Sequence, residues 1–314
     1  MNRPAPRERS EVSIDTLDLD HHQTLARAIR NILSTDLAEV TLAQLIDGLP
    51  LVSTVWDMKG SLLIKGHPLF NHDKLCQGAS EQARMFRDTF KPAILRFDSQ
   101  VMQSFQNAAQ GSREFNMRLT ELVTASIHQV AVLLFCSKSK LHSKEDIDAV
   151  VSWKIESQWV VLESGRRILE EEPLEPHPTL FYHVQYMDHE LYPHGLADVA
   201  GYWAEDRILG GVVAFDRGES QSECKDIYFL SGRRRTTFRV WRLLDNQFND
   251  MVEFLLSERP STPPFPLLAS MENRHRHDPW HAIALHNIFR DPWERKFPST
   301  APETRDVHAV GDYP

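Results

Sequence analysis

The sequence predicts an α+β fold, with a mainly helical first half and a small β-sheet packed with helices in the second half. Three patterns predict it. Apolar residues recur at helical spacing through residues 112–137, residues 179–187 alternate as a strand does, and residues 208–215 form a continuous apolar run. The length of 314 residues suits one large domain or two ordinary ones. We divide the chain into a disordered tail (1–18), a mainly helical region (19–172), an α+β region (173–297) and a loose tail (298–314).

The helical region has several local signals. Apolar spacing predicts helices over about 25–33, which Asp20 would cap, over 37–46, which Gly48 would end, and over 80–90. The longest apolar stripe predicts a helix over 112–137. Ser143 and Asp146 fit a capping box for a further helix over 143–169, and residues 50–66 fit a short hairpin with Lys59-Gly60 in its turn.

The second region changes character after the proline-containing linker near residues 170–178. Residues 179–187 predict a strand, 194–206 a short helix, 226–230 a strand, and 236–257 a helix of five turns. The run 208–215 has no polar face, so we expect a central strand that is covered on both sides. Gly210-Gly211 within it indicates a bulge or a close backbone approach.

Composition limits the class of protein. The net charge of −9 opposes general binding to nucleic acid. The N-terminus has no apolar segment typical of a signal peptide, and no apolar run approaches the roughly 20 residues of a membrane helix. The three cysteines lack the spacing of a zinc or redox motif, which indicates free thiols, and Cys136 is expected to fill the core. We therefore expect a soluble protein of the cytoplasm or nucleus.

Two segments carry a resemblance. The segment YPHGLADVAGYWAEDRILGGVVAFDRGES and the later HNIFRDPWERK are similar to a family of proteins from filamentous fungi. The resemblance covers roughly residues 175–297. Some members are encoded within secondary-metabolite gene clusters, which implies such a role here. The family has no agreed catalytic residues, so none is transferred.

Familiar catalytic motifs are absent: the sequence has no G-x-S-x-G, P-loop, G-x-G-x-x-G, H-E-x-x-H or C-x-x-C. Imidazole and carboxylate ligands gather at His183, His189, Glu190 and His194. Pro193 prevents one regular helix from presenting Glu190 and His194 together. We favour a histidine-rich surface loop and predict no metal site and no cofactor.

Acid–base candidates follow. Asp198, Tyr202 and Glu205 lie on one face of the predicted helix, close to His194, and could exchange protons if they were buried. We favour a solvated polar face instead. Asp216 ends the apolar strand, where ligands gather in open α/β sheets, although an aspartate before Arg217-Gly218 also suits a turn.

Two further segments suggest binding. Arg233, Arg234 and Arg235 precede the predicted helix over 236–257, where positive charge is unfavourable unless an anion, acidic side chains or solvent offsets it. Residues 273–295 mix histidine, tryptophan and arginine, as interface anchors do, but we prefer a segment that wraps back over the core.

Two functional hypotheses remain. The first is an accessory or binding protein of fungal secondary-metabolite biosynthesis, whose partner is a small-molecule intermediate or another biosynthetic protein. The second is a cofactor-independent isomerase, cyclase or hydrolase that acts on a largely apolar intermediate. It would use His194, Asp198, Glu205 or Asp216 as acid and base in an apolar pocket.

Overall fold

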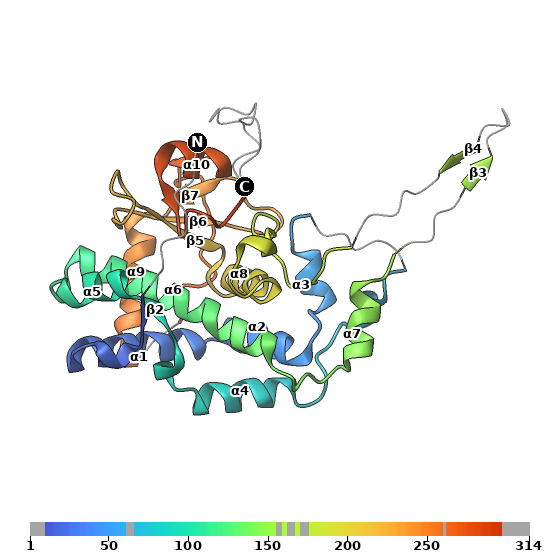
Figure 1. Cartoon of the computed structure of the whole chain (residues 1–314), viewed down its shortest axis with the longest axis horizontal. Coiled ribbons are helices and arrows are strands. Elements are labelled where there is room, and N and C mark those ends of the chain that lie inside the picture. The colour runs from blue at the N-terminus through green and yellow to red at the C-terminus, as the bar shows by residue number, and fades with distance from the viewer. Residues whose placement is uncertain are drawn as a thin grey trace.

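The predicted α+β fold is confirmed (Figure 1). The computed structural model describes residues 10–60, 66–154, 159–161, 167–169, 176–259 and 262–296. The described α-helices are α1 (Leu19–Leu33), α2 (Asp36–Asp47), α3 (Val52–Trp56), α4 (Ala79–Thr89), α5 (Ser99–Asn107), α6 (Arg113–Cys136), α7 (Lys144–Val151), α8 (Leu196–Leu209), α9 (Asp245–Leu256) and α10 (Pro279–His286). The strands are β1 (Glu11–Val12), β2 (Phe97–Asp98), β3 (Trp159–Val161), β4 (Arg167–Leu169), β5 (Val212–Asp216), β6 (Ile227–Leu230), β7 (Val240–Arg242), β8 (Arg276–His277) and β9 (Ile288–Phe289).

The main sheet has the strand order β8-β7-β6-β5-β9, and every neighbouring pair is antiparallel. Strand β5 is an internal strand, and its first four residues are fully buried. The expectation of a covered strand is therefore confirmed for residues 212–215. Ile208 and Leu209 instead form the last turn of α8, so the apolar run is divided between a helix and a strand.

Gly210 makes this division possible. It caps α8 with a φ of 106°, in the left-handed region that favours glycine. A Cβ at this position would lie 2.1 Å from the carbonyl oxygen of Leu267, whose amide donates to the Leu209 carbonyl at 2.7 Å. The predicted close backbone approach is confirmed at this glycine.

Helix α8 lies between the sheet and the helical region (Figure 1), and it contacts α6 on one side and β5 on the other. One hydrophobic core contains buried residues from both regions. The two regions therefore share a core, which gives α8 a largely buried surface on all sides.

The local helix signals of the first region are largely confirmed. Helices α2, α4 and α6 lie where the apolar spacing predicted, Gly48 caps α2 in the left-handed conformation, and the Ser143 hydroxyl accepts from the Asp146 amide at 3.1 Å. The cap of α1 is Asp18, not Asp20, because only the Asp18 carboxylate accepts the His21 amide.

Four sequence predictions are wrong. Residues 236–257 contain strand β7 before α9, because pairing with β6 and β8 buries Trp241 completely. Residues 179–187 form an irregular segment with a turn at 184–185, in which the Tyr186 amide donates to the His183 carbonyl at 2.8 Å. Helix α3 occupies Val52–Trp56, where the first strand of the hairpin over 50–66 was expected; Lys59-Gly60 lies in a turn, and residues 61–65 lie outside the described part of the chain. The helix over 143–169 ends at Val151, and β3 and β4 pair beyond it.

Of the two expected tails, 1–18 and 298–314, only residues 10–18 belong to the described part of the chain. Residues 10–18 are folded: β1 pairs with β2, and Ile14 is 1% exposed in a short 3₁₀ helix. Residues 1–9 and 297–314, together with the linker residues 170–175, lie outside the described part of the chain.

Candidate metal centre

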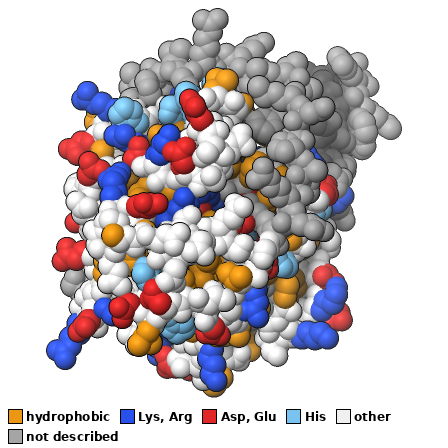
Figure 2. Space-filling view, turned by 60° about the vertical axis from the view of Figure 1, so that its left-hand side comes forward, with side chains coloured by type: hydrophobic (Ala, Val, Ile, Leu, Met, Phe, Trp, Pro, Cys, Tyr) orange, Lys and Arg blue, Asp and Glu red, His pale blue; other side chains and the backbone are white. Residues whose placement is uncertain are grey.

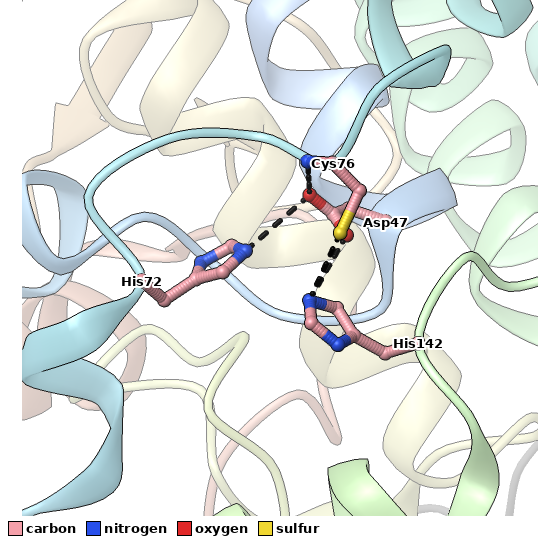
Figure 3. Close-up of side chains that lie close together, drawn as sticks. All are labelled: Asp47, His72, Cys76 and His142. Atoms are coloured by element: carbon pink, nitrogen blue, oxygen red, sulfur yellow. Dashed lines mark hydrogen bonds and ion pairs between the residues drawn. The ribbon is translucent and has the colours of Figure 1, made fainter.

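Four side chains with metal-binding atoms converge where three segments meet (Figure 3). Asp47 is the last residue of α2, His72 and Cys76 lie in the loop before α4, and His142 follows α6. The loop around His142 is held in place because the amides of Leu141 and His142 donate to the carbonyls of Ile46 and Asp47, at 3.2 and 3.0 Å. These backbone hydrogen bonds place His142 beside Asp47 at the end of α2.

The spacing of these atoms suits tetrahedral coordination. One ligand atom from each residue lies within 4.8 Å of all the others. His142 Nε2 is 3.4 Å from Cys76 Sγ and 3.3 Å from Asp47 Oδ1, and His72 Nε2 is 3.4 Å from Asp47 Oδ2. Zinc–ligand bonds of about 2.0–2.3 Å at tetrahedral angles place neighbouring ligands about 3.3–3.7 Å apart. These three contacts already have this spacing, the two to Asp47 through different carboxylate oxygens.

Two of the ligand atoms, Asp47 Oδ1 and His72 Nε2, are buried and have ion-pair contacts at 3.3 and 3.4 Å but no well-oriented hydrogen bond. Asp47 is 0% exposed. An unsatisfied polar atom in the interior normally costs free energy, so such atoms need a partner. A cation between the four residues would satisfy both.

The surroundings orient the ligands. His72 Nδ1 lies 3.0 Å from the Pro50 carbonyl, to which it can only donate, so Nε2 is left with the lone pair that a metal needs. The Cys76 amide donates to Asp47 Oδ2 at 2.9 Å and leaves Oδ1 facing the cluster. Each of these contacts has the form of the outer hydrogen bonds that support metal ligands.

The electrostatics match an acidic site that attracts a cation. Burial opposes ionisation of Asp47, but contacts with His72 and the Cys76 amide outweigh it and hold the pKa of the carboxyl below its ordinary value. The Asp47 carboxylate in turn raises the pKa of His72. Burial, with Asp47 beside it, raises the pKa of the Cys76 thiol to about 11.

A catalytic cysteine fits this geometry poorly. In a Cys–His–Asp arrangement the two imidazole nitrogens face different partners, whereas here His142 Nε2 faces both Cys76 Sγ and Asp47 Oδ1. A nucleophilic cysteine also needs a lowered thiol pKa, and that of Cys76 is raised. Convergence on one point is the pattern of coordination.

The predicted acid–base residues lie elsewhere: Asp198, Tyr202 and Glu205 are buried between α8 and α6, and His194, just before α8, is exposed. His128 of α6 bridges two of them, with Nε2 3.0 Å from Asp198 Oδ1 and Nδ1 3.0 Å from Glu205 Oε1. His194 Nδ1 is 3.2 Å from Asp198 Oδ1, and Tyr202 packs edge-on against His128. The expectation of a solvated face is wrong, because α6 covers it.

Arginine completes this cluster. The two terminal nitrogens of Arg290, Nη1 and Nη2, donate to the Glu205 carboxylate, and Nη2 also donates to the Val213 carbonyl at 3.0 Å. Burial opposes the charge on Glu205, but Arg290 and His128 hold its pKa below the ordinary value. The segment 273–295 thus wraps over the core, as preferred. These carboxylates have cationic partners, which accounts for their burial without a substrate.

One cavity of the described part of the chain lies away from these residues. It measures about 580 Å³ between α1 and the end of α4. Its lining residues are Ala26, Ile29, Arg30, Leu33, Ser34, Arg87, Asp88, Phe90 and Pro92. The acid–base candidates of the enzyme hypothesis do not line it.

The remaining candidates have structural partners. Asp216 Oδ1 accepts the Gly218 amide at 2.9 Å, which is the turn role. Arg233 pairs with Asp57 at 3.2 Å and donates to the Arg207 carbonyl, and Arg234 donates to the Met58 carbonyl. Arg235 is exposed. Since β7 separates these arginines from α9, they do not lie at a helix N-terminus, and anion binding by them stays a prediction.

The candidate ligands His183, Glu190 and His194 do not meet at one point, because each contacts a different partner. His183 is buried and contacts the Leu230 carbonyl at 3.1 Å, and Glu190 pairs with Lys296. His194 is turned toward Asp198. Sequence reasoning therefore missed the cluster that does converge; the only local signal was the spacing of His72 and Cys76, one helical turn apart.

The structure bears on the expectations of a soluble protein, of weak binding to nucleic acid, and of a buried Cys136. Helix α6 is long and apolar enough to cross a membrane, but 67% of its apolar window is buried, as in the core helix of a soluble protein. Acidic and basic side chains are interspersed on the face in Figure 2, without a broad basic patch there. Cys136 is exposed, so its predicted core role is wrong.

Comparisons with known proteins add no relative. No family model matches the chain, and neither a curated protein nor a solved structure gives a match. The resemblance to a fungal family stays a prediction.

Proposed function

We propose that this protein binds one zinc ion through Asp47, His72, Cys76 and His142. The observation that carries the proposal is the convergence of four ligand atoms within 4.8 Å, two of them buried without a well-oriented hydrogen bond. One thiolate, two imidazoles and one carboxylate form a ligand set that suits zinc better than magnesium or calcium, which prefer oxygen.

The ion has a structural role in this proposal. Four protein ligands fill a tetrahedral shell and leave no position for a substrate, as in structural zinc sites. The ligands come from the end of α2, the loop before α4 and the loop after α6. Zinc therefore fastens these segments together. At a free zinc concentration of 100 times the Kd, binding stabilises the fold by about 2.7 kcal/mol.

This role favours the accessory or binding protein over the enzyme. A closed metal shell stabilises a scaffold, and the buried carboxylates Asp198 and Glu205 are neutralised by His128 and Arg290. The scaffold would bind a small-molecule intermediate or another protein of secondary-metabolite biosynthesis. Deletion of the gene with metabolite profiling tests that part: a lost product supports it, and an unchanged profile contradicts it.

Metal analysis tests the zinc site. Protein purified without a histidine tag, loaded with zinc and dialysed is expected to contain one zinc ion per chain by mass spectrometry. Cys76→Ser and His142→Asn should lose it, while Cys136→Ser and His194→Asn, which alter an exposed cysteine and an exposed histidine outside the cluster, should keep it. Zinc-free wild-type protein after loading, or equal loss in the control variants, would falsify the proposal.

Cobalt provides a second readout that does not depend on stability. Cobalt-loaded protein should have the intense visible bands of tetrahedral Co²⁺ and a thiolate-to-cobalt charge-transfer band. Cys76→Ser should remove the charge-transfer band alone if cobalt still binds. Octahedral spectra in the wild-type protein would contradict the four-ligand shell.

A further inference from the structure

The proposed zinc centre contains a single sulfur ligand, and it comes from a residue that is partly exposed. Cys76 is half-buried and His142 has 23% of its side chain exposed, whereas Asp47 is completely buried. Cys76 and His142 thus lie on the outer side of the cluster. An oxidant would meet Cys76 before it met the aspartate.

We propose that Cys76 is an oxidation site at which a hydroperoxide converts the metal-bound thiolate to sulfenic acid, expels the metal and loosens α4 from α2. This inference rests on the proposed zinc function. It assigns the centre a regulatory role in addition to its structural one.

The chemistry needs only the hydroperoxide as co-reactant. The thiolate sulfur attacks the outer oxygen, an S–O bond forms, and the O–O bond breaks. Sulfur loses two electrons, which the departing hydroxide or alkoxide carries away, and this leaving group takes a proton to become water or alcohol. The sulfenic acid is a poorer ligand than the thiolate, so the zinc retains only two nitrogens and one oxygen from the protein.

No other cysteine belongs to the cluster. Cys136 is exposed at the end of α6, and Cys224 is half-buried before β6. Neither is among the four ligand residues. The product at Cys76 is therefore expected to persist as sulfenic acid until a reductant restores the thiol.

The structural consequence follows from how α4 is attached. Its fully buried side chains are two alanines, Ala79 and Ala83. Its ion pairs to α2 join Arg84 and Arg87 to Glu39 at 3.4 and 3.6 Å, and partly exposed pairs of this kind contribute little. Since Cys76 lies three residues before α4, the metal bond would anchor that end of the helix to α2 together with the Cys76 amide, which donates to Asp47 Oδ2.

The test uses the full chain with Cys136→Ser and Cys224→Ser, so that Cys76 is the only thiol. After zinc loading, hydrogen peroxide is added with a chromogenic chelator, and dimedone traps sulfenic acid for mass spectrometry. We expect one zinc released per trapped sulfenic acid, and recovery of binding after dithiothreitol and fresh zinc. Hydrogen exchange should accelerate in residues 73–89 and stay unchanged in α6.

A matched control has Cys76→Asp in the same background, which supplies an oxygen ligand that peroxide cannot oxidise. It should release zinc at least about tenfold more slowly than the parent. Zinc that stays bound after Cys76 is fully oxidised overturns the inference and leaves the zinc function standing, as does equal release from the Cys76→Asp control. A parent protein that never binds zinc overturns both proposals.

Discussion

Gly201→Ala tests how firmly His128 is held between α8 and α6. In the middle of an exposed helix this substitution stabilises by up to about 1 kcal/mol, because alanine favours the helix. Here an added Cβ would lie 2.6, 2.7 and 2.8 Å from three atoms of the His128 ring. The ring cannot swing away freely, since Asp198 and Glu205 each hold one of its nitrogens at 3.0 Å.

The expected magnitude follows from three contributions. Overpacking costs about 1–3 kcal/mol, and loss of one hydrogen bond to a charged group costs about 1.5–3 kcal/mol when the ring is displaced. Movement of the ring relieves part of this strain, and the higher helix propensity of alanine offsets up to about 1 kcal/mol of it. We therefore expect a net destabilisation of about 2 kcal/mol. Urea unfolding followed by tryptophan fluorescence measures it, at an unchanged m-value.

A double-mutant cycle isolates the cause. In a His128→Ala background the clash is absent, so Gly201→Ala should stabilise by up to about 1 kcal/mol, which gives a coupling energy of about 3 kcal/mol. Stabilisation by Gly201→Ala in the wild-type background would refute the reasoning, because it would mean that the imidazole is not fixed by its two carboxylates.

Three further predictions concern other parts of the core. Glu205→Gln should destabilise by about 3–5 kcal/mol in urea, because the buried Arg290 loses its carboxylate, and a cost below about 1 kcal/mol would contradict a buried pair. Burial lowers the pKa of His183 to about 4, so between about pH 6.5 and 4 the unfolded chain binds a proton that the folded chain does not. The free energy of unfolding should therefore decrease as the pH is lowered from 6.5 to 4, by up to about 1.4 kcal/mol per pH unit. His183→Gln should flatten this slope when unfolding is measured across that range. Ser112→Ala should cost about 1 kcal/mol by removing the cap of α6, Ser112→Asp should retain it, and equal midpoints for both variants would exclude a capping role.

The parts of the fold that could be predicted are those with local causes. Helices α2, α4 and α6 follow from apolar spacing, caps and a terminal glycine, all of which lie within the segment itself. Strand β7 could not be predicted, because Trp241 fits the helical spacing of residues 236–257 equally well. Only its partners β6 and β8 decide that it is a strand.

The sites depended even more on distant partners. The polar face of α8 looked solvated because His128 and Arg290, which neutralise it, lie far away in the sequence. The proposed zinc ligands come from three segments, and only His72 and Cys76 are close in sequence. Asp47 gave no signal of its own, since an aspartate before a glycine is ordinary at a helix end.

The bond between Glu205 and Arg290 also affects when the protein can finish folding. Strand β5 needs β9 at its edge, and the buried carboxylate of α8 needs a guanidinium that is synthesised 85 residues later. During translation, Glu205 can therefore pair only with His128 until Arg290 has been synthesised. A chain that ends before residue 290 would lack the guanidinium that pairs with Glu205, and we expect the packing of α8 to be less stable in it.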